Sequence, residues 1–217
     1  MSRQVLVILP LLLAAGCFGG EGNDRVNGDV RVAAGQPAAD ASTVNGSIDI
    51  AADATVGDAT TVNGSVMLGA RARAASLETV NGKVTVGEGA QVSGGVTTVN
   101  GAITLHTGAD VVGAVTNVNG RLLLEAAHVG GGIHTVGGDV TVGAGSRVEG
   151  GIEFRPTTGF SISFVKRAPV VIIGPGAVVQ GPLKFAREVK LYVSDRATIG
   201  EVSGAEAVRF SGDRPPE

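Results

Sequence analysis

The chain has one cysteine among its 217 residues, so an intramolecular disulfide is excluded. It has no tryptophan, one tyrosine and six phenylalanines, so we do not expect a layered core filled by bulky aromatic side chains. Basic residues are not concentrated anywhere and the formal net charge is −3, so nothing indicates binding to nucleic acid. The chain is instead rich in glycine, with 35 residues, and this predicts a narrow core of stacked Val, Ile and Ala.

Long hydrophobic runs are also missing, except at the N-terminus. Residues 5–15 form an apolar run that only Pro10 interrupts, and Arg3 makes the start of the chain basic. A run of this length is typical of a signal peptide and is too short to cross a bilayer, which takes about 20 apolar residues. The run ends in Leu13-Ala14-Ala15-Gly16-Cys17, which resembles the bacterial lipobox, with Ala14 where leucine is usual. We predict that residues 1–16 are removed and that Cys17 carries a lipid; an ordinary signal peptide with an incidental cysteine is the alternative.

The residue after the predicted lipid attachment site is Phe18. In Gram-negative lipoproteins an aspartate at this position retains the protein in the inner membrane. The resemblance to a lipobox therefore implies an exported protein, anchored in the outer membrane and facing the periplasm. Residues 17–25 contain several glycines and are expected to form a flexible linker between the lipid and the folded body.

The triplet Val-Asn-Gly recurs through most of the chain at a nearly fixed period. Its asparagines are separated by 18, 18, 18, 19 and 19 residues, and a degenerate copy, Val136-Gly137-Gly138, follows after 18 more. A fixed period in this range is the signature of a repeat array. The asparagines are Asn27, Asn45, Asn63, Asn81, Asn100 and Asn119.

Each repeat is divided into three hexads, in which small or aliphatic residues follow one another at alternating steps of four and two. A helix would repeat at 3.6 residues and a flat strand at 2. Three short strands separated by three corners place all of these side chains inside a triangular coil. We therefore predict an all-β fold, a single-stranded β-helix with about 18 residues per coil. The predicted core includes Val80, Val84, Val86, Val92, Val96, Ile103, Leu105, Val111, Val140, Val142, Val148 and Ile152.

The Asn-Gly pairs are expected at corners, because both residues tolerate the positive φ of a sharp turn. Asn-Gly also favours two-residue β-hairpins, so a meander of hairpins is the structural alternative. A meander would show two turn signals for each strand pair, whereas this sequence shows one strict Asn-Gly per repeat. In stacked coils the six asparagines form one column whose amides bond to one another, a structural role rather than a ligand-binding one.

The repeat continues after an interruption. Residues 143–154 match residues 174–185 in frame at an offset of 31, which is one 18-residue coil and 13 extra residues. At about 4.8 Å per coil, roughly ten coils make a rod about 45–50 Å long. We expect regular coils at residues 26–154, an insertion or flap at 155–169, the last coils at 170–210 and a polar tail at 211–217.

Catalytic motifs are missing from the sequence, which has no nucleophile elbow, no dinucleotide-binding or phosphate-binding loop and no C-x-x-C pair. His128 and His134 are one hexad apart, each beside an inward aliphatic residue, so both are expected on the surface of neighbouring sides. A zinc site needs three or four converging ligands. We therefore predict no catalytic residue, no metal site and no cofactor. The third histidine is His106. The aspartates Asp49, Asp53 and Asp58 are interpreted as part of a solvated face.

A threonine precedes the Val-Asn-Gly triplet in most repeats. Threonine columns order water in ice-binding solenoids, but these need two flat columns and only one is regular here. The high β-propensity of threonine is a sufficient explanation. The column consists of Thr43, Thr61, Thr79, Thr98 and Thr135, with Asn117 in one repeat.

The turns at residues 87–96 (GEGAQVSGGV) and 173–183 (IGPGAVVQGPL) resemble those of the bactofilin family. Bactofilins are bacterial polymer-forming proteins whose G-A-x-V-x-G turns build a right-handed triangular β-helix. The resemblance is one of repeat pattern over most of residues 26–210, and it implies a right-handed helix, scaffolding and self-assembly without catalytic residues. The chain departs from the family in its signal peptide, its strict Val-Asn-Gly corner and its insertion at residues 155–168.

These features predict a non-enzymatic lipoprotein of the cell envelope, a scaffolding rod whose partner is the membrane and which has no small-molecule substrate. The uncovered end of a β-helix has unpaired backbone groups that can template another copy, so end-to-end self-association is also expected. The polar tail and the flap with Phe160 and Phe164 are expected to protect the C-terminal end and leave the N-terminal end open, which favours short oligomers or dimers over long filaments. Two alternatives remain, a surface adhesin or ligand-binding solenoid and a left-handed hexapeptide-repeat acyltransferase. The acyl donor of such a transferase is cytosolic, whereas this chain is predicted to be exported.

Overall fold

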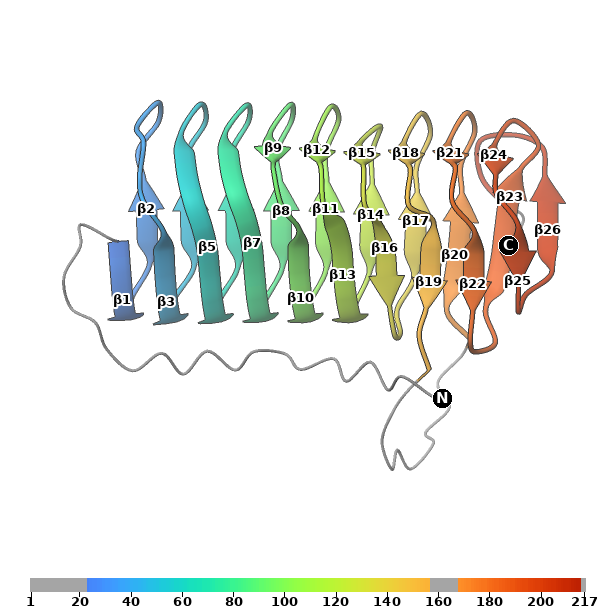
Figure 1. The fold of residues 1–217 in the computed structure, drawn as a ribbon, viewed down its shortest axis with the longest axis horizontal. Coiled ribbons are helices and arrows are strands. Elements are labelled where there is room, and N and C mark those ends of the chain that lie inside the picture. Colours follow the sequence, from blue (N-terminus) through green and yellow to red (C-terminus); the bar gives the residue numbers. More distant parts are fainter. Residues whose placement is uncertain (1–22, 157–167, 216–217) are drawn as a thin grey trace, which may run out of the picture.

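The protein is a rod of stacked β-coils in the computed structural model, which describes residues 23–156 and 168–215 (Figure 1). Within these residues the secondary structure consists of 26 strands and no helix. Each strand pairs in parallel with the equivalent strand of the next coil, 18 or 19 residues away in the regular repeats, as in Val66↔Val84 and Val84↔Ile103. The chain is therefore an all-β solenoid of about ten turns, as the sequence predicted.

The first side of each coil contributes one strand to a ten-stranded parallel sheet. Its strands alternate, so that Val84 and Val86 are completely buried while Thr85 between them faces outward. These strands are β2 (Val30–Val32), β4 (Ile48–Ile50), β6 (Val66–Leu68), β8 (Val84–Val86), β11 (Ile103–Leu105), β14 (Leu122–Leu124), β17 (Val140–Val142), β20 (Val170–Ile173), β23 (Lys190–Ser194) and β26 (Ala207–Phe210).

The second and third sides together form a sixteen-stranded sheet. In two coils they are one continuous strand, β5 (Thr55–Asn63) and β7 (Arg73–Asn81), and β7 pairs with separate strands for the two sides of the next coil. The separate second-side strands are β9 (Gln91–Val92), β12 (Asp110–Val111), β15 (His128–Val129), β18 (Arg147–Val148), β21 (Val178–Val179) and β24 (Thr198–Ile199). The third-side strands are β1 (Asn23–Asn27), β3 (Ala41–Asn45), β10 (Val96–Asn100), β13 (Ala114–Asn119), β16 (Gly132–Thr135), β19 (Ile152–Phe154), β22 (Leu183–Phe185) and β25 (Val202–Ser203).

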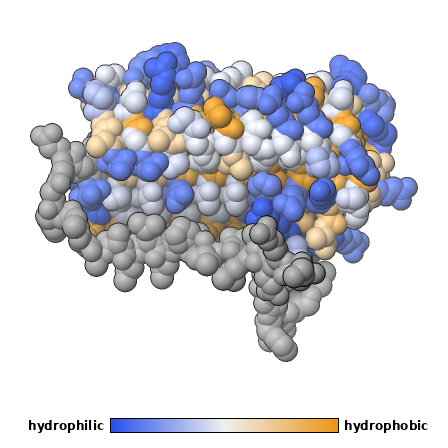
Figure 2. Space-filling model, viewed as in Figure 1, coloured by the Kyte–Doolittle hydropathy of each residue, from blue (hydrophilic) through white to orange (hydrophobic). Residues whose placement is uncertain are grey.

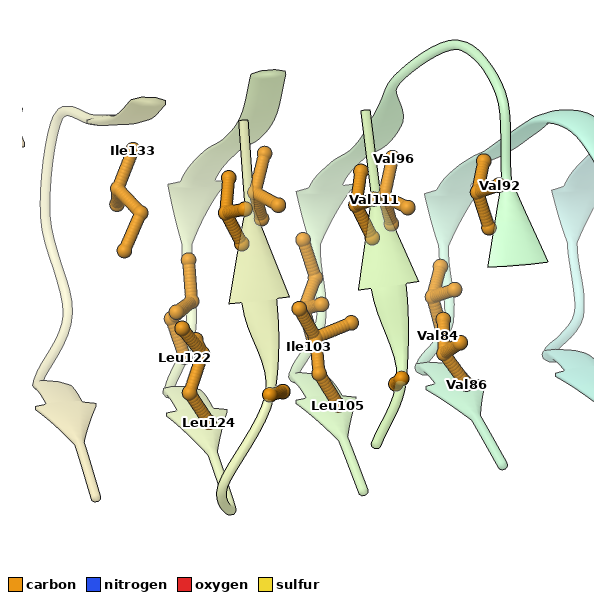
Figure 3. Close-up of a cluster of buried hydrophobic side chains, with 14 of the residues drawn as sticks. Val84, Val86, Val92, Val96, Ile103, Leu105, Val111, Leu122, Leu124 and Ile133 are labelled. Carbon is orange, nitrogen blue, oxygen red and sulfur yellow. The ribbon is translucent and has the colours of Figure 1, made fainter. Parts of the chain in front are cut away.

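The core is a narrow stack of aliphatic side chains that point inward from all three sides (Figure 3). Eleven of the twelve predicted core residues are at most 1% exposed. Val80 is the exception, because it is half-buried and faces outward. Alternation along β7 from the buried Leu77 places Thr79 inward instead, so the prediction was wrong by one position at this point.

The interruption of the repeat lies between β19 and β20. The register across it joins Val140 to Val171 and Ile152 to Leu183, which reproduces the offset of 31 residues. Residues 157–167 of the predicted insertion lie outside the described residues, as do the signal sequence and Cys17. The first strand begins at Asn23, three residues before the predicted start of the coils at residue 26.

The last coil leaves part of the core uncovered. Ile199 and Val202 face inward but are partly exposed, whereas Val179 and Leu183, one coil earlier in the same register, are completely buried. The described part of the polar tail, residues 211–215, thus leaves Ile199 and Val202 partly exposed, and the predicted flap around Phe160 and Phe164 lies outside the described residues.

Candidate functional site

The polar side chains of the rod are arranged in columns, because equivalent residues of successive coils stack in register. The predicted column of six corner asparagines is present. From Asn45 onward, the side-chain amide nitrogen donates to the amide oxygen of the asparagine one coil earlier, at distances of 2.9, 3.0, 3.0, 3.1 and 3.2 Å. The side chains are exposed, and their donors and acceptors are used in bonds between coils, which is a structural role.

The asparagine column ends at Asn119, because the next repeat has Gly137 in its place. The guanidinium group of Arg187 lies beside this glycine and donates a hydrogen bond of 3.0 Å to the backbone carbonyl of Val136. A side chain at Gly137 would approach both Arg187 and Asn119. The loss of the asparagine thus makes room for an arginine that binds the corner backbone.

The glycines of the Val-Asn-Gly corners have a different role from the one predicted. A positive φ occurs at Gly28, Gly120 and Gly138, but not at the corner glycines of the coils between Gly28 and Gly120. A Cβ atom on one of these glycines, such as Gly82, would overlap the carbonyl oxygen of the corner glycine one coil earlier. Close approach between coils, rather than backbone conformation, therefore requires glycine there.

Positive φ is instead a feature of the corner between the first and second sides. One residue in most coils adopts φ between 46° and 72° there, and three of these residues are not glycine, namely Asp53, Arg71 and Ala126. Asp53 and Arg71 are stacked and form a two-pronged ion pair, with N–O distances of 2.8 and 2.7 Å. Hydrophilic side chains gather along this edge of the rod, at the top in Figure 2.

The threonine column is buried and hydrogen-bonded, which β-propensity alone does not explain. The hydroxyl groups of Thr43, Thr61, Thr79 and Thr98 each donate to the carbonyl oxygen of the corner glycine one coil earlier, at 2.8–3.2 Å. Asn117 makes the same bond with its amide nitrogen, at 2.8 Å. The amide oxygen of Asn117 is buried and has no hydrogen-bond partner within the described part of the chain. The strict spacing of threonine and glycine was the signal for this bond in the sequence.

Each of the three histidines binds a carboxylate on a neighbouring coil. The Nδ1 atom lies 2.7 Å from Glu125 in His106, 2.6 Å from Asp110 in His128 and 3.0 Å from Glu153 in His134. The Nε2 atom of His128 is also 3.5 Å from Glu149, which follows β18 on the same side of the next coil. The histidines lie in separate columns, as predicted for His128 and His134, and they link coils rather than converge on one point.

Two carboxylates in these pairs hold their protons more weakly than usual. A hydrogen bond from Arg147 lowers the pKa of Glu149, and contact with His128 adds to this effect. For Glu153, partial burial raises the pKa, but the hydrogen bond and charge of Arg155 together with His134 outweigh it, so the net shift is downward. Both side chains therefore stay ionised and bonded to cations at neutral pH.

The three predicted surface aspartates do not come together. Asp49 is exposed on the first side. Asp53 is bound to Arg71, whose hydrogen bond lowers the pKa of the Asp53 carboxyl group. Asp58 accepts a 2.6 Å hydrogen bond from the hydroxyl of Ser76 on the next coil. These carboxylates do not form a paired acid and base.

No group of three or more His, Cys, Asp or Glu side chains in residues 23–156 and 168–215 is placed to hold a metal ion. Over the same ranges no helix is long and apolar enough to cross a membrane.

The comparisons with known proteins add no relative to this picture. Neither a protein-family model, nor a curated protein, nor a solved structure matches the chain significantly.

Proposed function

We propose that the protein is a lipid-anchored, non-enzymatic structural rod of the cell envelope. The observation that carries the proposal is the set of polar columns that bond successive coils from Asn27 to Asn119, followed by histidine–carboxylate pairs as far as Glu153. Asparagine amides, threonine hydroxyls and histidine–carboxylate pairs are used in bonds from one coil to the next. The polar side chains of these columns therefore stabilise the stacking of the coils and do not converge on a reactive centre.

The shape suits a spacer. Ten strands in the first-side sheet, stacked at about 4.8 Å, give a rod roughly 45–50 Å long. Each coil contacts its neighbours, so rigidity extends along the whole array. The bactofilin-like turns at residues 87–96 and 173–183 support a scaffolding role for this rod.

The anchor follows from the N-terminal sequence. Cys17 ends a lipobox-like segment, and residues 17–22 separate it from β1, which begins at Asn23. Six residues span about 20 Å even when fully extended. The N-terminal end of the rod is then held close to the membrane, and the C-terminal end is presented farthest from it. Phe18, in place of aspartate, supports the outer membrane as the location.

The anchor is tested by growing cells with labelled palmitate and isolating the protein. Wild-type protein is expected to carry the label and to sediment with outer membranes, whereas Cys17→Ser is expected to carry none. A wild-type protein without label, or a Cys17→Ser variant that keeps it, would show that this proposal is wrong. A Thr85→Cys variant that also carries Cys17→Ser has its cysteine at an outward position of the folded body, and it is the control for label at any other cysteine.

A second candidate function, binding through a flat face, is favoured by one observation. The outward column of the first-side sheet has no charged residue over eight consecutive coils. It consists of Met67, Thr85, Thr104, Leu123, Thr141, Ile172, Tyr192 and Val208. Binding of the purified protein to isolated cell envelopes is the test: Leu123→Lys should reduce it at least tenfold, and equal binding rejects this candidate. The acyltransferase alternative gains no such support, because the histidines lie in separate columns.

A further inference from the structure

The C-terminal end of the rod differs from its interior by one charged residue in a core position. The second inward position of the first-side sheet is aliphatic in nine successive coils, from Val32 to Val193. In the tenth coil the register places Arg209 there, opposite the completely buried Val193. Its side chain is exposed, and its guanidinium donates a 3.2 Å hydrogen bond back to the carbonyl of Ser194.

The N-terminal end has an equivalent residue in another column. Arg25 on β1 pairs in register with Thr43, which begins the buried polar column of the third side. Every later member of this column down to Phe185 is at most 6% exposed, but Arg25 is exposed. Both ends of the rod thus carry an arginine where the interior has a buried side chain.

Both ends would otherwise suit the addition of another coil. The last strands β24, β25 and β26 each pair with a strand on one side in the sheets of the described chain, and the inward residues Ile199 and Val202 are partly exposed there. A second copy added in head-to-tail register would set its β2 against β26 and continue every column. A contact of this kind does not close on itself and builds filaments.

The arginines oppose that contact. A coil placed against β26 would enclose the guanidinium of Arg209 between Val193 and Val32 of the added copy. Arginine stays charged at any ordinary pH, so it cannot escape burial by losing its proton. The hydrogen bond that the structure shows for it goes to a backbone carbonyl, and a buried charge without an ionic partner is strongly unfavourable. Inward-pointing charge at an exposed sheet edge is a known way of preventing edge-to-edge association.

We propose that Arg25 and Arg209 block the two ends of the rod against head-to-tail addition of a second copy of this chain, so that the rod keeps a finite length. This inference goes beyond the proposed function, because it holds whether or not Cys17 carries a lipid. It also means that a chain with bactofilin-like turns is held as single rods by two side chains.

The test compares three forms of the full chain, solubilised in detergent, by sedimentation and electron microscopy. The first is wild type, the second is Arg25→Thr with Arg209→Val, and the third is the control Arg31→Thr with Arg121→Val. The control removes the same charge from two exposed, outward positions, one of them on β2 at the N-terminal end. Circular dichroism checks that each form keeps its β-structure, and Arg209→Ala replaces Arg209→Val if the latter does not fold.

We expect wild type and control to sediment as single rods. The end variant is expected to associate at least tenfold more tightly and to form rods that are whole multiples of the single length. Three results would overturn the proposal: a folded end variant that stays single, a wild-type protein that already forms end-to-end chains, or a control that associates as strongly as the end variant. Side-by-side aggregates without lengthening count against it as well. Failure of the palmitate experiment would leave all of these outcomes unaffected.

Discussion

The N-terminal and C-terminal parts of the rod fill the same column with different chemistry. From Thr43 to Thr98 a buried hydroxyl in each coil donates to the corner glycine of the coil before it. After Thr135, whose hydroxyl turns to Gly137 in its own corner, the column continues with Phe154 and Phe185. Their rings pack with centroids 5.4 Å apart.

This difference shows that asparagine, glycine and threonine act as one unit. Where the Asn-Gly corner is present, the glycines let the coils approach closely and a buried carbonyl needs a donor, which threonine supplies. Where the corner is lost, after Gly138, the packing of Phe154 and Phe185 takes the place of the hydrogen bond in this column. In this column, the N-terminal coils are therefore joined by hydrogen bonds and the C-terminal coils by apolar packing.

The largest effect is expected in the aromatic part. Phe154→Ala removes a side chain that is 1% exposed and should lower the free energy of unfolding by about 3–5 kcal/mol. Urea unfolding followed by circular dichroism measures the loss, and Phe154→Leu, which refills most of the space, should cost clearly less. A loss below about 1 kcal/mol for the alanine variant would mean that apolar packing does not hold this part.

In the N-terminal part, the hydrogen bond rather than the volume should matter. Thr79→Val keeps the shape of the side chain but leaves the carbonyl of Gly64 without its donor, at a cost of about 1–3 kcal/mol. Thr85→Val makes the same chemical change at an outward position and should be nearly neutral. Equal losses for the two variants in thermal unfolding would contradict the role of the buried column.

The asparagine ladder should contribute less, because its side chains are exposed. Asn63→Ala removes two ladder bonds and should cost about 1 kcal/mol, whereas Asn119→Ala removes one and should cost about half as much. Urea unfolding of the two variants measures the ratio. If the two losses are the same, the ladder bonds do not carry the effect.

Asn117 is the position in the buried polar column at which a substitution is expected to raise the stability of the protein. Asn117→Thr keeps a donor for Gly101 and removes the amide oxygen that lacks a partner, so we expect a gain of about 1 kcal/mol. Asn100→Thr, in the exposed ladder, is the matched control and should lose stability instead. Thermal unfolding distinguishes a rise in Tm for the first from a fall for the second; a fall for both would refute the assignment.

The smallest effect is a dependence on pH in the C-terminal part. Because the pKa of Glu153 is lowered in the folded protein, its contribution is present above the ordinary glutamate value of 4.5 and is lost as pH falls below it. The side chain is 43% exposed, so the change should be on the order of a few tenths of a kcal/mol. Urea unfolding at pH 7 and at acid pH should show a flatter dependence for Glu153→Gln than for wild type. An unchanged dependence would rule out this contribution.

The sequence by itself determined the repeat, the three sides of each coil and the asparagine ladder. These features depend on a period, and a fixed period of 18 or 19 residues with inward positions such as Val84 and Val111 allows few other folds. The offset of 31 residues placed the interruption by the same argument. The predicted lipid site at Cys17 depends on a local motif and needs no fold at all.

Only the tertiary structure decided the roles that depend on contact between coils. Valine is more apolar than threonine, so the pattern favoured Val80 as the inward residue, but alternation from Leu77 placed Thr79 there. The same contact explains why the corners need glycine and why the hydroxyl of Thr79 is bonded. Arg25 and Arg209 are ordinary charged residues in the sequence, and only the register of the terminal strands places them in core columns. Distances between coils are set by stacking, which a single repeat cannot encode.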